Sequence, residues 1–373
     1  MSLGSDSSGG LLAAVREPFE GPNTMGNTPA FWLGLTAAVT LLAAMPVLFG
    51  YYAAEIGAVF LAYALLGVSL CFIWGYCGIL SFGQVAFFGV AGYAFGIVAI
   101  NVPTLTGLTL GLLAAVAVST AFAAALGYFM FYGGVRDVYV TILTLVVALV
   151  LYTFLGQTAG GEWAIGDARL GGFNGMSGVP DLGVGIGSVG LEIGIVGHYY
   201  VTLGALVVTY LGLRALVNSQ FGYAMVATRE DERRTEMFGY DTTFIKFVVF
   251  TIGGAIAGLS GVLFTAQNNY IDPSVFGITA AALPVVWASV GGRTSLIGTI
   301  GAALAIQFVD YQLALSGSEW ALVLIGSLLV FVILVMPEGV APRLHEYVVE
   351  YRASPDPTPA ETPAPGEVHG GDD

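Results

Sequence analysis

The stretch NSQFGYAMVATREDERRTEMFGYDTTFIK, residues 218–246, decides how the rest of the chain is arranged. Apolar runs over residues 199–217 and 244–266 flank it. Its nine charged side chains are Arg229, Glu230, Asp231, Glu232, Arg233, Arg234, Glu236, Asp241 and Lys246. Because charged side chains are costly in a bilayer, a segment so rich in charge must leave the apolar environment of its neighbours. The sequence therefore predicts a polar loop between two membrane-spanning segments.

The composition extends this prediction to the whole chain. Of 373 residues, 56% are hydrophobic and only 10% are charged, with a mean hydropathy of +0.83. A soluble globular protein has about 25% charged residues. So little polar surface cannot cover a water-exposed globule, and we expect an all-α, polytopic membrane protein. The net charge of −14 lacks the clustered positive charge that phosphates require, so we expect no nucleic-acid partner.

No catalytic or metal-binding pattern is visible. The histidines and cysteines are His198, His345, His369, Cys71 and Cys77. The two cysteines form no CxxC or zinc spacing, and we interpret them as core residues. A nucleotide-binding P-loop needs Gly-Lys-Ser/Thr, whereas the only lysine, Lys246, lies between Ile245 and Phe247. We therefore expect no cofactor bound by this chain; if its function uses ATP, another polypeptide must hydrolyse it.

Segments long enough to cross a hydrocarbon core of about 30 Å need roughly 20 mostly apolar residues. Ten segments approach this length: 31–50, 53–74, 79–100, 107–131, 138–156, 198–217, 244–267, 277–290, 296–314 and 320–337. The segment 277–290 is short, so the predicted count is nine to ten spans. Alternate threading places ten of the 11 basic residues on one side, with only Arg169 on the other. Since Lys and Arg mark cytoplasmic loops, both termini and the charged loop are predicted to be cytoplasmic.

Three kinds of region follow from this threading. Residues 1–30 are predicted to be a disordered cytoplasmic tail, and residues 343–373 an acidic, Pro-rich, disordered cytoplasmic tail. Residues 31–342 form the membrane domain, with a cytoplasmic loop over 218–243 and an external loop over 157–197. Glycines at 253, 254, 258 and 261 predict close helix packing.

Several motifs occur in a consistent order along residues 55–342. They are WGYCGILSFGQ (74–84), Phe87-Phe88, Gly92-Tyr93, GGFNGM (171–176), Arg229-Glu230-Asp231-Glu232, Arg234, Gly239-Tyr240, Lys246, Phe250, YIDPS (270–274), Gly291-Gly292-Arg293, Trp320, Gly326 and Pro337-Glu338-Gly339. Together they resemble the LivM-like permease subunits of ABC importers for hydrophobic amino acids and amides, the branched-chain amino acid and urea family.

The resemblance implies a permease that binds its partners at defined places. The partners are a second permease subunit, two cytoplasmic ATPases that use ATP, and an external solute-binding protein, all at the cell membrane. The ATPase-docking loop would contain Arg229, Glu230, Asp231, Glu232, Arg233, Arg234 and Gly239. One departure is Arg234-Thr235, where many ABC importers carry an Ala pair after the acid of this loop.

Details of the motifs favour the urea branch of the family. These are Ile73-Trp74-Gly75-Tyr76, the segment 92–96, Trp287 ahead of Gly291-Gly292-Arg293, and Glu232 with Arg234 and Gly239-Tyr240. We therefore expect urea or a short amide as the substrate. A branched-chain amino acid importer is the alternative, and an ATP-independent secondary transporter or channel is a further one.

Candidate pathway or helix-bracing residues are Ser81, Gly83, Gln84, Tyr93 and Asp310. Ser81 is expected to line or brace the pathway at a helix start and to cap the third span, because serine is favoured at N-caps. Asp310 is a carboxylate inside a span, which is a functional hypothesis by default. Gly291, Gly292 and Arg293 are expected to form a cytoplasmic turn.

Overall fold

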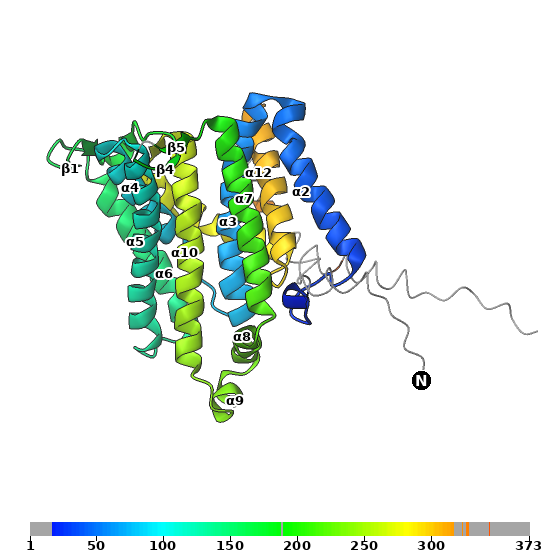
Figure 1. Cartoon of the computed structure of the whole chain (residues 1–373). Coiled ribbons are helices and arrows are strands. Elements are labelled where there is room, and N and C mark those ends of the chain that lie inside the picture. Colours follow the sequence, from blue (N-terminus) through cyan, green and yellow to red (C-terminus); the bar gives the residue numbers. More distant parts are fainter. Residues whose placement is uncertain (1–16, 188, 317–322, 324–325, 328–342, 344–373) are drawn as a thin grey trace, which may run out of the picture.

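Long apolar helices build the molecule (Figure 1). The computed structural model describes residues 17–187 and 189–316, together with residues 323, 326–327 and 343. Within this part of the chain, eight helices are long and apolar enough to cross a membrane. They are α2 (Pro29–Phe49), α3 (Tyr51–Cys77), α4 (Gln84–Asn101), α5 (Leu105–Phe131), α6 (Asp137–Gly156), α7 (Ile195–Val217), α10 (Thr242–Asn268) and α12 (Leu296–Leu315). The predicted all-α, polytopic architecture is confirmed.

A shorter apolar helix, α11 (Ile278–Gly291), corresponds to the short eighth segment of the sequence. Its 14 residues span about 21 Å at 1.5 Å per residue, which is less than the hydrocarbon core. The last predicted span, residues 320–337, lies outside the stretches that the structure describes.

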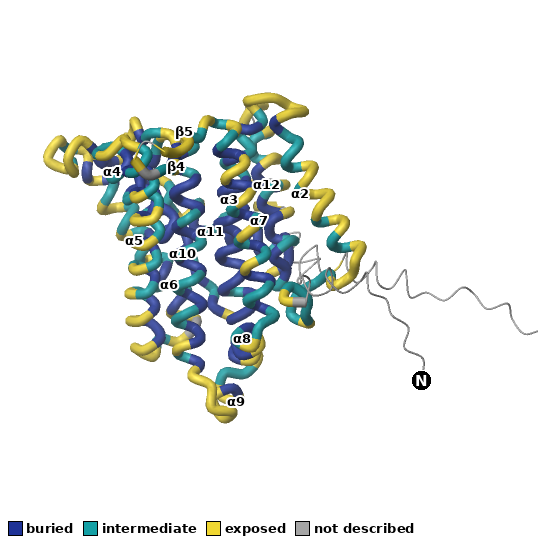
Figure 2. Tube along the Cα trace, viewed as in Figure 1, coloured by how far each residue is buried: buried dark blue, intermediate teal, exposed yellow. Residues whose placement is uncertain are grey.

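Helix α3 forms the centre of the bundle. It packs against α7, α10, α11 and α12, and its side chains are buried over most of its length (Figure 2). Helix α10 packs against α4 and α5 through its glycines. A Cβ at Gly261 would overlap the Phe88 carbonyl, and the Ser119 hydroxyl donates to the Gly254 carbonyl at 3.1 Å. Helix α2, in contrast, is largely exposed at the periphery.

The two loops singled out in the sequence lie at opposite ends of the bundle (Figure 1). At one end are two short helices, α8 (Gln220–Glu230) and α9 (Glu232–Met237). At the other end, the segment 157–197 is folded into short elements: β1 (Ala164–Ile165), β2 (Ala168–Arg169), η2 (Gly172–Asn174), β3 (Met176–Ser177), β4 (Gly183–Ile186) and β5 (Val189–Glu192). Strand β3 pairs antiparallel with β6 (Tyr270–Ile271), and η3 (Pro273–Phe276) follows.

The prediction of a disordered tail over residues 1–30 is wrong for its second half. Residues 17–28, which we call the N-terminal strap, begin with η1 (Glu17–Phe19) and lie on the end of α7. Helix α2 then starts at Pro29, with Thr28 as its N-cap. The physical reason is that polar side chains at the end of α7 bind strap carbonyls. Residues 1–16 and, apart from Arg343, the C-terminal tail lie outside the described residues.

Candidate functional site

Capping side chains divide the charged loop into two helices. Asn218 ends α7, and the Ser219 hydroxyl accepts from the Gly222 amide at 3.3 Å to begin α8. Asp231 ends α8 and also begins α9, where its Oδ1 accepts from the Arg234 amide at 3.0 Å. Such side-chain acceptors satisfy amides that have no partner within the helix. Ser219 and Asp231 therefore determine where α8 begins and ends.

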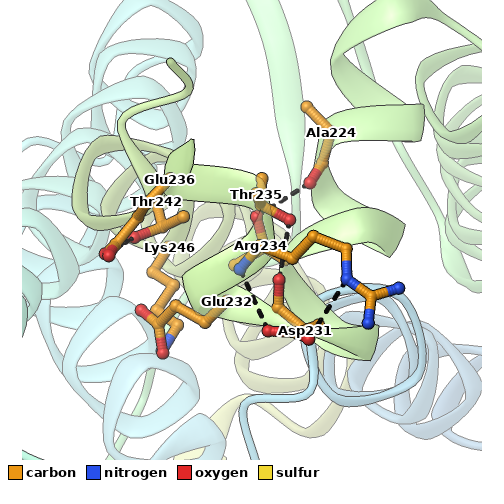
Figure 3. Close-up of polar contacts among 9 residues, drawn as sticks. Ala224, Asp231, Glu232, Arg234, Thr235, Glu236, Thr242 and Lys246 are labelled. Carbon is orange, nitrogen blue, oxygen red and sulfur yellow. Dashed lines mark hydrogen bonds and ion pairs between the residues drawn. The ribbon is translucent and has the colours of Figure 1, made fainter. Parts of the chain in front are cut away.

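Helix α9 depends on contacts with α10, because six residues are too few for a stable isolated helix. Lys246 in α10 donates to Glu232 Oε2 at 2.7 Å, and the Thr242 hydroxyl donates to Glu236 Oε1 at 2.9 Å (Figure 3). The Lys246 side chain is 9% exposed, so this ion pair is shielded from solvent on one side. The only lysine of the chain thus holds α9 against the start of α10.

Arg229 fixes the other short helix to the core. Its guanidinium donates to the Gly75 carbonyl in the last turn of α3 and to the Glu230 carboxylate. A cation is favourable at the C-terminal end of a helix, where carbonyls lack partners. Arg229, Asp231 and Glu232 therefore hold the loop in shape, which leaves other residues to face outward.

The outward face of the loop combines positive charge with apolar side chains. Arg233 and Arg234 are exposed, and Arg234 Nε lies 3.4 Å from Asp231 Oδ2. Met237 and Phe238 are 86% and 77% exposed, just before Gly239, whose φ is +87°. The sequence-based reasoning missed Met237 and Phe238. The available signal was two adjacent large apolar residues within a charged segment. Exposed apolar patches of this kind mark interaction sites.

The SFGQ segment braces neighbouring helices. Ser81 is buried, and its hydroxyl accepts from the Gly83 amide at 3.0 Å. Gly83 itself is the N-cap of α4, so the expectation that Ser81 caps this helix is wrong: the turn over residues 78–83 delays the helix start. Gln84 Oε1 accepts from the Ser69 hydroxyl of α3 at 3.0 Å, while its Nε2 has no partner among the described residues.

The remaining pathway candidates do not join this segment. Tyr93 lies nine positions after Gln84, which is about two and a half turns along α4. Its ring stacks on Phe276 with centroids 6.1 Å apart, and its buried hydroxyl has no partner in the described part of the chain. Asp310 is half-buried in α12. The structure therefore places Tyr93 farther along α4 than the SFGQ segment, and Asp310 on a different helix.

The turn between α11 and α12 lies against α3. Gly292 has a φ of +102°, and the Arg293 carbonyl accepts from the Cys71 thiol at 3.2 Å. The Tyr76 hydroxyl donates to the Thr294 carbonyl at 2.8 Å. The Arg293 side chain is exposed. This turn therefore lies near the end of α3 that also holds Arg229.

At the opposite end, two motifs far apart in the sequence meet. Met176, which ends the GGFNGM segment, pairs with Ile271 of the YIDPS segment. The Tyr270 hydroxyl donates to the Asn174 carbonyl at 3.1 Å. Partial burial, and then the neighbouring Asp272 carboxylate, raise the pKa of Tyr270 above its usual value. No group of three or more His, Cys, Asp or Glu side chains that could hold a metal occurs among the residues that the structure describes.

A helical bundle with a capped pair of loop helices at one end defines a polytopic membrane protein. The family model described as "Branched-chain amino acid transport system / permease component" matches residues 52–333. The chain belongs to this family of ABC transporter permeases, and it is a transport subunit, not an enzyme.

Individual relatives agree with this assignment. The chain is 25% identical to LivM of Escherichia coli (strain K12), a high-affinity branched-chain amino acid transport system permease protein, over 89% of this chain and 80% of LivM. LivM of Salmonella typhimurium (strain LT2) is 26% identical over 86% of this chain and 77% of that protein. LivH of E. coli, also a high-affinity branched-chain amino acid transport system permease protein, is 30% identical over 37% of this chain and 46% of LivH. No solved structure matches the chain.

Proposed function

We propose that this chain is one of two permease subunits of an ATP-driven importer for branched-chain amino acids. The observation that carries this proposal is the similarity to two LivM proteins over more than four-fifths of the chain. The preference for urea or a short amide rests only on short motifs, and neither the family match nor the relatives support it. The branched-chain amino acid alternative thus becomes the main hypothesis.

The partners would be a second permease, two cytoplasmic ATPases and an external solute-binding protein. The partial similarity to LivH supports a related subunit as the second permease. ATP would be bound and hydrolysed by the ATPases, since this chain has no P-loop lysine. The subunit would lie in the cell membrane with both termini in the cytoplasm, as the distribution of arginines predicts.

The loop helices would form the contact with one ATPase. Met237 and Phe238 would enter an apolar groove, as helices do in groove recognition, with Arg233 and Arg234 facing acidic side chains around it. Closure of the ATPases would then move α8 and α9 and favour one of two permease states. Arg234-Thr235 fits this arrangement: Thr235 is buried against the loop, so only the arginine faces the partner.

Reconstitution in liposomes tests the proposal. The complete complex, with its binding protein, is expected to import leucine only when ATP is present, with unlabelled valine but not urea as a competitor. Import of urea instead of leucine would move the protein to the urea branch. Uptake by this chain alone without ATP would show a secondary transporter or channel and would overturn the proposal.

A further inference from the structure

Arg214, in the last turn of α7, is a buried charge outside the docking loop. It is 1% exposed, and all five guanidinium N–H groups have acceptors. The Nε donates to the Phe19 carbonyl at 2.6 Å; the other acceptors are the Met25 carbonyl (3.1 Å), Tyr210 hydroxyl (3.0 Å), Gly26 carbonyl (2.9 Å) and Asn27 Oδ1 (3.2 Å). Four of these five acceptors belong to the N-terminal strap.

Among the described residues, the hydrogen-bond acceptors of Arg214 are all neutral groups. Within the described residues, no carboxylate forms an ion pair with Arg214. Instead its guanidinium carbon lies 4.7 Å from the ring centroid of Phe31 and 4.9 Å from that of Trp32, both in the first turn of α2. Because an arginine without compensation is costly to bury, the strap and the start of α2 must both be in place around it.

The strap also closes the end of α7 where α8 begins. Asn23 Nδ2 donates to the Val217 carbonyl at 3.0 Å, which would otherwise lack a partner at this helix end. Asn218 Nδ2 donates to the Thr24 hydroxyl at 2.9 Å and to the Phe19 carbonyl at 3.2 Å. The strap therefore binds the joint at residues 218–219, from which the docking helices extend.

Helix α2 is attached to α7 at two places. Beyond the strap, in the second half of α2, the Tyr199 hydroxyl donates to the Leu42 carbonyl at 2.6 Å, and the Tyr200 hydroxyl donates to the Ala43 carbonyl at 3.0 Å. Between the two attachments, an apolar crevice of about 530 Å³ separates α2 from α7 and α12. Polar contacts on either side of this crevice thus help to hold α2 against α7.

Beside the strap, α8 borders a second cavity. This cavity has a volume of about 580 Å³, and strap residues, Tyr76, Val226, Arg229 and Thr294 line it. The space lies between α8 and the strap, near the fixed joint at residues 218–219. This cavity leaves space between α8 and the strap, while Arg229 and the buried Met225 attach α8 to the bundle, so a tilt of α8 about this joint must break the Arg229 contact with Gly75.

We propose that Arg214 is a positioning residue that makes the strap, α2 and α7 move as one body when the docking helices move. The inference rests on the proposed function, since an ATPase must supply the movement of α8 and α9. Without the guanidinium, α7 would still follow α8, but the strap end of α2 would be released. Figure 1 shows the strap in dark blue beside the start of α2.

Spin-label distances in the complete complex test this proposal. Labels at Leu33→Cys in α2 and Val208→Cys in α7 use exposed positions, and both natural cysteines are buried. In the wild-type background, the distance distribution is expected to stay narrow and unchanged between the nucleotide-free and the vanadate-trapped complex. In Arg214→Met the distance distribution is expected to broaden. Arg214→Lys should not restore the narrow distribution, because an ammonium cannot reproduce the five donors of the planar guanidinium. Arg136→Met, which removes an exposed arginine on the turn between α5 and α6, is the matched control.

Transport gives a second readout. The ATP hydrolysed per leucine imported is expected to rise about fivefold or more in both Arg214 variants and to stay unchanged in Arg136→Met. A purely structural loss would lower import and hydrolysis together.

If Arg214→Met does not accumulate, Gly26→Ala disrupts the same site from the strap, because Gly26 has a φ of +83° and faces the Phe31 ring. Wild-type-like narrow distances in these variants would overturn the proposal. Broadened distances in a complex without ATP-driven import would instead count against the proposed function alone.

Discussion

Asp231 shows how one side chain sets the shape of the loop. It ends α8, begins α9 and pairs with the exposed Arg234. The capping hydrogen bond and the ion pair differ in how much they stabilise the loop. An N-cap contributes about 1 kcal/mol, whereas an exposed ion pair contributes between about 0 and 1 kcal/mol. Of the two Asp231 contacts, the capping hydrogen bond therefore contributes more to the order of α9, in addition to the contacts with α10.

Substitution of Asp231 separates the two tasks. Asp231→Ala removes the cap and is expected to cost α9 about 1 kcal/mol, so that its amides exchange hydrogen several-fold faster and ATP-driven leucine import falls. Asp231→Asn keeps a capping oxygen and loses only the charge, so exchange and import should stay near wild type. Hydrogen exchange of the membrane complex, read by mass spectrometry, measures the first effect. Equal behaviour of the two variants would show that the charge, not the cap, orders α9.

At this scale the sequence predicted part of the site. The charged residues of the loop were visible because they interrupt apolar runs. The separate roles of its arginines were not, because Arg229 differs from Arg233 through a tertiary contact, its hydrogen bond to the Gly75 carbonyl. Arg214 was assigned only to the cytoplasmic end of a span, since its strap acceptors lie 187 to 195 residues away.

Helix α10 illustrates packing between elements. Its glycines let α4 and α5 approach closely. As a result, the Ser119 hydroxyl of α5 reaches the Phe87 carbonyl of α4 at 3.0 Å and the Gly254 carbonyl of α10 at 3.1 Å. In lipid, where apolar surface gains little by association, such close contact is a main source of helix affinity. The glycine spacing predicted this face correctly because it depends only on the sequence of one helix.

Leucine at Gly261 is expected to disrupt this face. The added side chain would meet the Phe88 backbone, which cannot move aside as a flexible side chain would, and overpacking costs about 1–3 kcal/mol or more. We expect a lower thermal unfolding midpoint in detergent for Gly261→Leu. The matched control is Gly204→Leu on α7, where nothing lies within 4 Å of the added Cβ. A control that unfolds at the same lowered temperature would argue against the packing explanation.

The first residue of α4 is a feature that the sequence did not predict correctly. Hydropathy placed a span at residue 79, whereas the helix begins at Gln84. The intervening residues are as apolar as a helix, so hydropathy cannot separate them from it. The turn forms because the Phe82 amide donates to the Thr144 hydroxyl of α6 at 3.2 Å, a contact visible only in three dimensions.

The whole molecule has two chemically different ends. Loop helices with exposed arginines lie at one end, and paired short strands lie at the other (Figure 1). This separation followed from the sequence, because alternate threading depends only on the order of apolar and polar segments. The side of the membrane that each end faces is a further prediction from the arginine distribution.

Labelling of intact cells tests this orientation. Cysteine at Arg233, in the loop, is expected to react with an impermeant maleimide only after the membrane is opened. Cysteine at the exposed Glu192 should react in intact cells. The natural cysteines, Cys71 and Cys77, are buried and should give little background. Reaction at position 233 in intact cells would reverse the orientation.

The Arg214 contacts also impose an order on biosynthesis. The Gly26 carbonyl and the guanidinium that binds it are separated by 188 residues. At about 5–20 residues per second, a ribosome needs roughly 10–40 s to add them. Throughout this interval the nascent α2 has neither Arg214 nor the two tyrosines of α7 to hold it. The strap end of α2 is therefore fastened only after α7 has been made, and until then α3, which directly follows α2 and packs against it, is its neighbour in the bundle.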